Sequence, residues 1–488
     1  MSDPSHIEMT EIVNSKAGTV SNAPPLRIEQ FQQDVARIAA AHEFQVFAVG
    51  GYVRDCVMGR TPYDLDLLAL GDGIQFARIV ADKLNLPKPV EFNKFDTARL
   101  IFRNAHVEVI GVGMQTDEDP APGPENLDIR LRRDLARRDF TVNAMALPLL
   151  ETGQDSIVDL FDGQGDIQRG IIKTPLPPAI TLTTDPIRLM RAIRFAAQLD
   201  FQIEETAWQT ICQAAAAVHN TSQERITEEL LKMLALSKPS EAFALLKSSG
   251  LLVIILQEID ALSGVEIVDG KGHKDVLLHT LQVVDNVAKV SENIALRFAA
   301  LMHDVAKPRT KKFEPAAGWT FHGHDDFGAR MTGRIARRLK LPKVFSEYAQ
   351  KMVRHHLRPI HLADEGVTDS AVRRLSVLLE DDLDDLMLLC RADITSKNPR
   401  RVRRHLANFD LVCERVEVVK DKDELRNFHS PVTGEEIMRE CKIEPGPVIG
   451  RIKRQIEDAI LQGDIPNEHD AAFDYFLQIK DAIIDTTE

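Results

Sequence analysis

The segment VGGYVRDCVMGRTPYDLDLLAL, residues 49–70, contains the pattern from which the fold of the N-terminal part can be predicted. Gly50 and Gly51 end the apolar run FQVFAV (44–49), and Asp64 and Asp66 head a second apolar run. These runs predict two β-strands with a helix starting between them at the glycines. Because side chains at positions i and i+2 of a strand lie on one face, the two aspartates are expected side by side.

Two carboxylates this close raise the pKa of one of them and destabilise the fold unless a cation lies between them. Magnesium prefers carboxylate oxygens, and two such ions could activate an attacking hydroxyl and stabilise a leaving pyrophosphate. Gly50 and Gly51 would let backbone N–H groups approach a triphosphate closely. We expect a third acid on a neighbouring strand, with Glu108 in HVEVIGV (106–112) as the candidate. A pair of solvated surface carboxylates is the alternative for Asp64 and Asp66.

Five segments resemble, in order, the motifs of class II CCA-adding enzymes, which are tRNA nucleotidyltransferases related to bacterial poly(A) polymerases. The segments are VGGYVRD (49–55), DLDLLAL (64–70), RRDFTVNAMAL (137–147), DPIRLMRAIRFAAQL (185–199) and ERITEELLKML (224–234). The resemblance implies an α/β nucleotidyltransferase head of the polymerase-β type, followed by a long all-α neck, body and tail. It also implies addition of C, C and A to tRNA 3′ ends from CTP and ATP without a nucleic-acid template, with Mg²⁺ at the head.

The resemblance assigns roles to several residues of the head and neck. It places Arg138 on the triphosphate and Asp139 on the sugar hydroxyls, which suits a forked guanidinium and an accepting carboxylate. It makes Asn143 a supporting residue of the site. Together with the metal ligands Asp64 and Asp66, the nucleotide-binding set that it implies is Gly50, Gly51, Arg54, Arg138, Asp139, Asn143, Asp185 and Arg188.

Asp185 and Arg188 lie three residues apart at the start of a predicted helix, so they share one face. The resemblance implies that they read the Watson–Crick edge of the incoming base, for which they offer suitable acceptors and donors. The alternative is an acidic residue at the helix start that pairs with the arginine one turn later. The family usually has glutamate before this aspartate, and here the residue is Thr184.

A second group of chemistry-bearing residues follows in the C-terminal half. His279, the pair His303–Asp304 and Asp393 resemble the pattern of an HD phosphohydrolase domain, and Lys307 follows the pair as in many such domains. Imidazole and carboxylate ligands suit a divalent transition metal that activates water against a phosphoester. In CCA-adding enzymes with HD domains, the resemblance implies hydrolysis of 2′-phosphate or 2′,3′-cyclic phosphate ends. The same region also contains His322, His324, His355 and His356.

The charge distribution favours binding of one specific nucleic acid over non-specific binding of many. A net charge of −14 argues against non-specific coating of nucleic acids but allows a local basic surface. Two basic groups are candidates for contact with the tRNA backbone, with merely solvated surface charges as the alternative. The first lies on one face of a predicted helix and contains Arg330, Arg334, Arg337 and Arg338. The second contains Lys397, Arg400, Arg401, Arg403 and Arg404.

The remaining composition favours the cytoplasm. Five scattered cysteines indicate a reducing compartment and no thiolate zinc site. The apolar run LLVIIL (251–256) is far shorter than the roughly 20 residues that span a membrane. No secretory signal pattern opens the chain. The oligomeric state cannot be predicted from the sequence.

The expected segments are a mobile N-terminal tail (1–25), the nucleotidyltransferase head (26–175), a helical RNA-binding neck (176–265), the HD domain (266–400) and a helical tail (401–488). Three alternatives to full CCA addition stay open. They are a bacterial poly(A) polymerase, an enzyme that adds only CC or only A, and an HD phosphohydrolase with a degenerate head. The acidic balance and the HD motif favour CCA addition over a poly(A) polymerase, and the intact Asp64, Asp66, Asp139 and Arg188 argue against a degenerate head.

Overall fold

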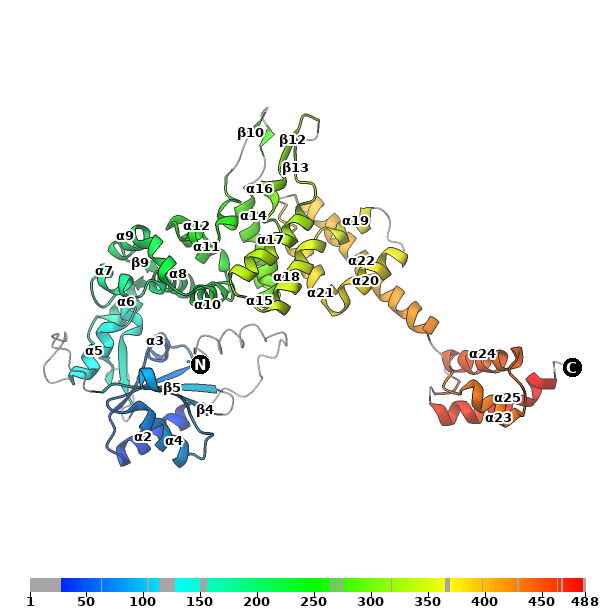
Figure 1. Ribbon diagram of the computed structural model, residues 1–488, viewed down its shortest axis with the longest axis horizontal. Helices are drawn as coiled ribbons and strands as arrows, with labels where there is room; N and C mark the ends of the chain where they lie inside the picture. Colours follow the sequence, from blue (N-terminus) through cyan, green and yellow to red (C-terminus); the bar gives the residue numbers. More distant parts are fainter. Residues whose placement is uncertain are drawn as a thin grey trace. The chain divides into compact units, whose positions relative to one another are not determined.

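A computed structural model of the chain (Figure 1) describes residues 28–485 apart from 63, 103–104, 114–127, 150–155, 265–266, 269–270, 273–274, 317, 365–368, 397, 428–429, 463 and 467. The expected N-terminal tail lies outside the described residues. The chain divides into two compact units. The first contains residues up to 359 together with 384–402, and the second contains residues 360–383 and 403–488.

The first unit begins with a mixed sheet of seven strands in the order β3-β4-β5-β2-β1-β6-β7. At its centre β2 pairs with β1 in antiparallel fashion and with β5 in parallel fashion. The strands expected at 44–49, at Asp66 and at 106–112 correspond to β1, β2 and β5, so this expectation is confirmed. The bounds are β1 (Val46–Val49), β2 (Leu65–Ala69), β3 (Val90–Phe92), β4 (Thr97–Phe102), β5 (Ala105–Gly111), β6 (Met145–Pro148) and β7 (Val158–Asp159).

Helices cover both faces of this sheet. On one face α2 (Ile28–Ala41) and α4 (Gly73–Lys83) pack over Leu67 of β2, and on the other α5 (Ile129–Arg137) packs over Leu68. Burial on both faces explains why β2 reads as a continuous apolar run rather than an alternating one. Asp66 shares a face with Leu68, and therefore lies on the side that α5 covers.

Helices dominate the chain after the sheet, as the sequence predicts (Figure 1). The structure adds three short two-stranded ladders that no sequence periodicity indicated, because their strands have only two or three residues: β8 (Ile171–Ile172) with β9 (Gln202–Ile203), β10 (Ile267–Val268) with β11 (Lys271–Gly272), and β12 (Lys312–Glu314) with β13 (Gly318–Thr320). The helices of the first unit that follow the sheet strands are α6 (Gly163–Arg169), α7 (Pro178–Thr184), α8 (Ile187–Leu199), α9 (Glu205–Ala214), α10 (Gln223–Leu234), α11 (Pro239–Ser248), α12 (Leu251–Ile255), α13 (Gln257–Asp260), α14 (Val276–Ala288), α15 (Ile294–Met302), α16 (Lys307–Thr310), α17 (His324–Arg338), α18 (Lys343–His355) and α21 (Leu383–Ala392).

Helix α15 packs against α14 and α18, and all of its residues are buried. Its one charged residue, Arg297, donates to the carbonyl oxygens of Leu234 and Leu236 at the end of α10 and of Ser291 and Ala288 after α14. The guanidinium thereby satisfies carbonyls that the helix ends leave without partners. Arg297 is therefore buried, and its hydrogen bonds join α15 to the ends of α10 and α14.

The second unit is helical and has its own core of Val432, Ile437, Ile452, Ile456, Ala472 and Phe476. Helix α23 (Gly434–Cys441) begins with a capping box in which Thr433 and Glu436 bond each other's backbone N–H groups. The other helices of this region are α19 (Arg358–Asp364), α20 (Asp369–Leu379), α22 (Pro399–Asn427), α24 (Pro447–Gln462) and α25 (His469–Asp485).

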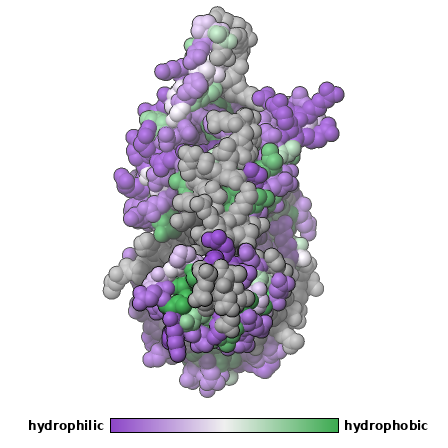
Figure 2. All heavy atoms as spheres, turned by 90° about the vertical axis from the view of Figure 1, so that its right-hand side faces the viewer, coloured by the Kyte–Doolittle hydropathy of each residue, from purple (hydrophilic) through white to green (hydrophobic). Residues whose placement is uncertain are grey.

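The surface of the described residues is mostly hydrophilic, with apolar side chains in small separate groups on the face that Figure 2 shows. Among the described helices, none has both the length and the apolar character needed to cross a bilayer.

Candidate functional site

Residues from three separate segments meet at Gly50, directly after β1. Gly50 has a φ of +71°, a conformation that favours glycine. A methyl group placed on it would lie 3.3 Å from Oδ2 of Asp66 and 3.3 Å from Nη1 of Arg138. The structure therefore brings Gly50, a predicted metal ligand and a predicted triphosphate ligand together at one point.

The three candidate carboxylates of the head lie on neighbouring strands. Asp64 directly precedes β2 and is exposed, whereas Asp66 lies within β2 and is partly buried. The parallel register pairs Asp66 with Glu108 of β5, as expected for a third acid on the adjacent strand. However, Glu108 accepts a hydrogen bond of 2.7 Å from Arg99, whose guanidinium already balances its charge. A metal-binding role for Glu108 stays a prediction.

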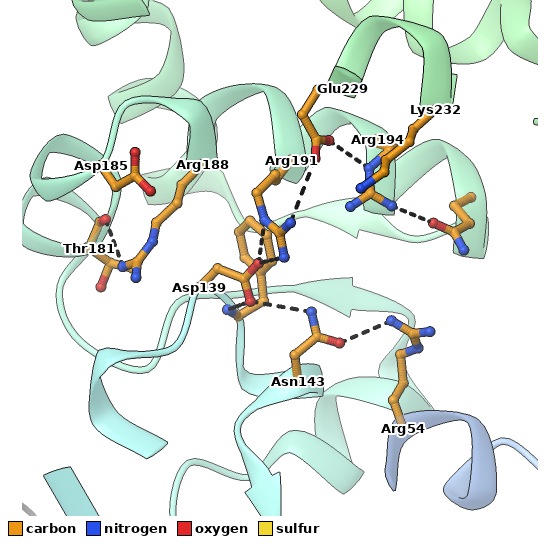
Figure 3. A network of polar contacts seen from close by, with 12 residues as sticks. Arg54, Asp139, Asn143, Thr181, Asp185, Arg188, Arg191, Arg194, Glu229 and Lys232 are labelled. Atoms are coloured by element: carbon orange, nitrogen blue, oxygen red, sulfur yellow. Dashed lines mark hydrogen bonds and ion pairs between the residues drawn. The ribbon is translucent and has the colours of Figure 1, made fainter. Parts of the chain in front are cut away.

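A buried chain of charged side chains connects the head to α8 and α10 (Figure 3). Arg54 of α3 (Gly51–Val57) donates to Asn143 at 3.0 Å, and Asn143 donates to Asp139 at 3.3 Å. Arg191 of α8 donates two hydrogen bonds to Asp139, at 2.8 and 2.7 Å, and its Nη1 lies 3.6 Å from Glu229 of α10. Glu229 also accepts from Arg194 at 2.7 Å. Arg191, Arg194 and Glu229 were not singled out from the sequence, although all three lie within the quoted motifs.

Asp139 accepts more hydrogen bonds than the other carboxylate of this network, Glu229. Its carboxylate is 7% exposed and accepts two N–H groups of Arg191, the Phe140 amide and the Asn143 side chain. Burial opposes its ionisation, but the guanidinium of Arg191 and these hydrogen bonds hold its pKa below the ordinary value. Since both oxygens already have two donors, a ribose hydroxyl would have to replace one of them. The sugar contact of Asp139 therefore stays a prediction, whereas its hydrogen bonds connect Asn143 of the head to Arg191 of α8.

A histidine–aspartate cluster lies among α14, α15 and the segment after α21. Nε2 of His279 lies 2.9 Å from Oδ1 of Asp393 and 3.4 Å from Nε2 of His303. Nε2 of His303 lies 3.3 Å from Oδ2 of Asp304. The four residues that the sequence predicted as metal ligands thus converge on one point.

The electrostatics of this cluster favour a bound cation. Burial alone would lower the pKa of His303, but Asp304 and Asp393 raise it to about 10. The carboxylates therefore create a strongly negative environment around a buried ring. Two imidazoles and two carboxylates form a donor set that suits a divalent transition metal.

Comparisons with known proteins agree with this arrangement. Family models match three consecutive parts of the chain: the poly A polymerase head domain at residues 46–173, the probable RNA and SrmB-binding site of polymerase A at 200–262, and the HD domain at 276–398. A "Multifunctional CCA protein" of Nitrosococcus oceani is 30% identical over 369 residues, which are 72% of this chain and 85% of that protein. The chain belongs to the CCA-adding tRNA nucleotidyltransferase family. An "A-adding tRNA nucleotidyltransferase" of Deinococcus radiodurans is 32% identical, with coverage of 73% of this chain and 80% of that protein.

Solved structures of this family share the fold. A tRNA nucleotidyltransferase solved with a primer tRNA and an incoming ATP analog superposes with a TM-score of 0.56 at 20% identity, and covers 79% of this chain and 99% of that one. A CCA-adding enzyme solved with ATP gives 0.54 at 19% identity, with 98% of each chain covered. The expected fold class, a nucleotidyltransferase head followed by helical neck, body and tail, is confirmed.

In this member of the CCA-adding family, Asp185 and Arg188 lie close together but have separate partners (Figure 3). Arg225 of α10 donates to both oxygens of Asp185, at 3.0 and 2.7 Å. Arg188 donates to the carbonyl oxygens of Thr181, at 3.1 Å, and Arg137, at 2.6 Å. The alternative in which Asp185 pairs with Arg188 is therefore not the arrangement found. Both oxygens of Asp185 and both terminal nitrogens of Arg188 are therefore occupied by other partners, and recognition of the base by this pair stays a prediction.

We expect Arg225→Ala to raise the KM for both CTP and ATP by about tenfold, because Asp185 would lose the partner that orients it. Steady-state nucleotide addition to tRNA measures this effect. The matched control is Lys232→Ala, which removes an ion pair with Glu228 on the same helix. Equal KM values for Arg225→Ala and wild type would show that Asp185 does not contact the base.

The first basic group lines a groove between α17 and α18. Arg330, Arg334 and Arg337 border this groove of about 850 Å³, together with Lys343 and Gln350. Arg338 donates two hydrogen bonds of 2.7 Å to Glu258, and its contact with tRNA stays a prediction. Of the second group, Arg400, Arg401, Arg403 and Arg404 are exposed on α22, and Lys397 lies outside the described residues.

Proposed function

We propose that the chain adds C, C and A to the 3′ ends of tRNA from CTP and ATP without a nucleic-acid template. The observation that carries this proposal is the meeting of Asp66 and Arg138 at Gly50 in a chain of this family. A metal-binding carboxylate and a phosphate-binding guanidinium are the two groups that nucleotidyl transfer needs next to a triphosphate. The covalent change is attack of the tRNA 3′ oxygen on the α-phosphorus, with release of pyrophosphate.

The residues of the head and neck divide this task. Asp64 and Asp66 would hold Mg²⁺, which when bound supplies charge for the attacking and leaving oxygens. Arg138 would bind the triphosphate, and Asp185 with Arg188 would hydrogen-bond the base edge. The network through Asp139, Asn143 and Arg54 would keep the head and the base-binding helix in register.

A second candidate is addition of the terminal A alone. The relative from Deinococcus radiodurans that carries this name is as similar to the chain as the multifunctional relative. Poly(A) synthesis is less well supported, since one of these relatives is named for CCA and the other for addition of A to tRNA. A degenerate head is also poorly supported, because the carboxylates and arginines of the site are in place.

Three incubations separate these candidates. With tRNA that lacks its last three nucleotides, a CCA-adding enzyme incorporates two residues from CTP alone and none from ATP alone. With tRNA that ends in CC, it incorporates one residue from ATP. An A-adding enzyme gives only the last product, whereas a poly(A) polymerase extends either tRNA with a long A tract. Absence of incorporation in all three would contradict the proposal.

We further propose that the histidine–aspartate cluster binds a divalent transition metal and hydrolyses 2′-phosphate or 2′,3′-cyclic phosphate ends of RNA. Support comes from the convergence of His279, His303, Asp304 and Asp393 and from the HD family match. Removal of such a phosphate would restore a 3′ end that the head can extend. A variant with His303→Ala and Asp304→Ala should lose hydrolysis of a 2′,3′-cyclic phosphate end, and undiminished hydrolysis would contradict this assignment.

We also propose that the α17–α18 groove binds the tRNA phosphate backbone, because three arginines and Lys343 surround it. A variant with Arg334→Glu and Arg337→Glu should weaken tRNA binding and reduce the slope of log Kd against log salt by about two. Fluorescence anisotropy over a series of salt concentrations measures both quantities. The control has the same charge change at two exposed lysines of the head, Lys83→Glu and Lys88→Glu. An equal loss in both variants would exclude a specific role for the groove. Arg400, Arg401 and Arg404 stay candidates for further backbone contacts.

We propose the cytoplasm as the place of action. None of the five cysteines, all of which lie in the described part of the chain, forms a disulfide, as expected in a reducing compartment. Transfer RNA, CTP and ATP are also present there.

A further inference from the structure

We propose that the histidine–aspartate cluster holds two divalent metal ions, with Asp304 as the bridging ligand and His324 and His356 as ligands of the second ion. This inference rests on the proposed function, in which His279, His303, Asp304 and Asp393 hold the first ion. It adds two ligands that the HD pattern predicted from the sequence did not include.

The ligand atoms of the second site come from three elements. Asp304 follows α15, His324 begins α17 and His356 follows α18. Their side chains have ligand atoms within 4.8 Å of one another. Their exposed fractions are 1%, 8% and 1%, so all three are buried. Three buried polar side chains therefore bring their ligand atoms to one point.

The two oxygens of Asp304 point to different partners. Oδ2 lies 3.3 Å from Nε2 of His303 and 3.5 Å from Nε2 of His279, on the side of the first site. Lys307 also donates to Oδ2, at 2.6 Å. Oδ1 lies 3.5 Å from Nε2 of His324. A carboxylate whose two oxygens face different sets of ligand atoms can bridge two cations.

Two atoms of the second site lack hydrogen bonds although they are buried. Within the described part of the chain, Oδ1 of Asp304 and Nε2 of His324 have no hydrogen-bond partner. Such atoms are uncommon in folded proteins, because leaving a buried polar atom unsatisfied is costly. Two ligands about 2.1 Å from one metal lie about 3.4 Å apart at a tetrahedral angle. The 3.5 Å separation of these two atoms fits a shared ion.

Backbone carbonyls orient the imidazoles for metal binding. Nδ1 of His324 lies 2.8 Å from the carbonyl oxygen of Phe321, and Nδ1 of His356 lies 2.7 Å from that of Val353. His303, a ligand of the first site, has the same arrangement with Ala300 at 2.7 Å. When Nδ1 donates its N–H to a carbonyl, Nε2 carries the lone pair that binds a metal. The two additional histidines are therefore prepared in the same way as a ligand of the first site.

Packing alone explains part of this arrangement. The ring of His356 makes edge contacts with those of His303 and His324, with centroid distances of 5.5 and 5.3 Å. Such contacts account for the burial of the rings, but they leave the unsatisfied Oδ1 and Nε2 atoms unexplained. Two divalent ions also carry more positive charge than Asp304 and Asp393 can balance. The pair of ions would therefore attract a phosphate group, in agreement with a phosphoester substrate.

Metal stoichiometry of the full chain tests the proposal. The measurement uses Co²⁺ and isothermal titration with elemental analysis, in a background of Asp64→Asn and Asp66→Asn that removes the proposed head site. We expect two Co²⁺ per chain in this background and one after His324→Ala or His356→Asn. His322→Ala is the matched control, because His322 is exposed two residues before His324, and it should keep two ions.

With Mn²⁺, we expect the electron paramagnetic resonance signal of a coupled pair in the background protein and an isolated ion in the His324→Ala variant. Addition of ATP to tRNA ending in CC, measured with Asp64 and Asp66 intact, shows that each variant folds. One Co²⁺ in the background protein, or two in His324→Ala, would overturn the two-ion proposal and leave the first site standing. No bound Co²⁺ at all would contradict the proposed function of the cluster as well.

Discussion

Replacement of Asp64 or Asp66 by alanine is expected to reduce nucleotide addition by about a thousandfold or more. Each carboxylate is proposed to hold the ions that balance the charge of the triphosphate and of the leaving pyrophosphate, and no neighbouring side chain can replace it. Glu108, the nearest acid in the register of β2 and β5, is paired with Arg99. Initial rates of CTP incorporation into tRNA that lacks its CCA end measure the loss.

The proposed hydrolase activity of the histidine–aspartate cluster provides the control for this prediction. The Asp64→Ala and Asp66→Ala proteins should hydrolyse a 2′,3′-cyclic phosphate end at the wild-type rate, because the histidine–aspartate cluster uses none of the head carboxylates. Conversely, the His303→Ala protein should incorporate CTP into tRNA at the wild-type rate. Incorporation at the wild-type rate in Asp66→Ala would show that the aspartates are surface carboxylates.

Arg191→Met is expected to lower the free energy of unfolding of the first unit by about 3–5 kcal/mol. The substitution leaves the buried carboxylate of Asp139 without its guanidinium partner and removes a neighbouring charge from Glu229. Urea denaturation followed by circular dichroism measures the change. The matched control is Arg78→Met, since Arg78 makes an equally short pair of hydrogen bonds with Glu91 at an exposed position.

The pH dependence of the Arg191→Met effect identifies its cause. The depressed pKa of Asp139 means that its ion pair stabilises the wild type above the pKa of an unfolded aspartate. This stabilisation is lost as the pH falls through the lower pKa of the folded state. The unpaired carboxyl of the variant can take up a proton as the pH falls from 7 toward about 4. The difference in free energy of unfolding between Arg191→Met and wild type should therefore become smaller over this pH range. A constant difference would indicate lost packing rather than an unpaired charge.

The elements that hold the head site were predictable from the sequence because the signals are local. An apolar run that ends in Gly50–Gly51, and a second run headed by Asp64 and Asp66, determine β1, α3 and β2 within a few residues. The strands β3, β6 and β7 were missed, since they are short and owe their place to pairing with distant segments. The ladders of the helical part were missed for the same reason.

The candidate site was predictable as a set of residues but not as a set of contacts. Arg225 reaches Asp185 across 40 residues and Arg191 reaches Asp139 across 52. Such pairings depend on how helices pack, and nothing in the spacing of either residue indicates them. The histidines at 324 and 356 were visible in the sequence, yet only the structure shows that their ligand atoms lie close to Asp304.

The most direct test of the central claim is the sequence of the product. Full-length chain is incubated with CTP, ATP and tRNA that lacks its last three nucleotides, and individual 3′ ends are sequenced. We predict ends that read CCA and stop there, with wild-type protein only and not with Asp66→Ala. Unextended ends from the wild type, or ends that read as a run of A, would contradict the assignment of the Gly50–Asp66–Arg138 site to CCA addition.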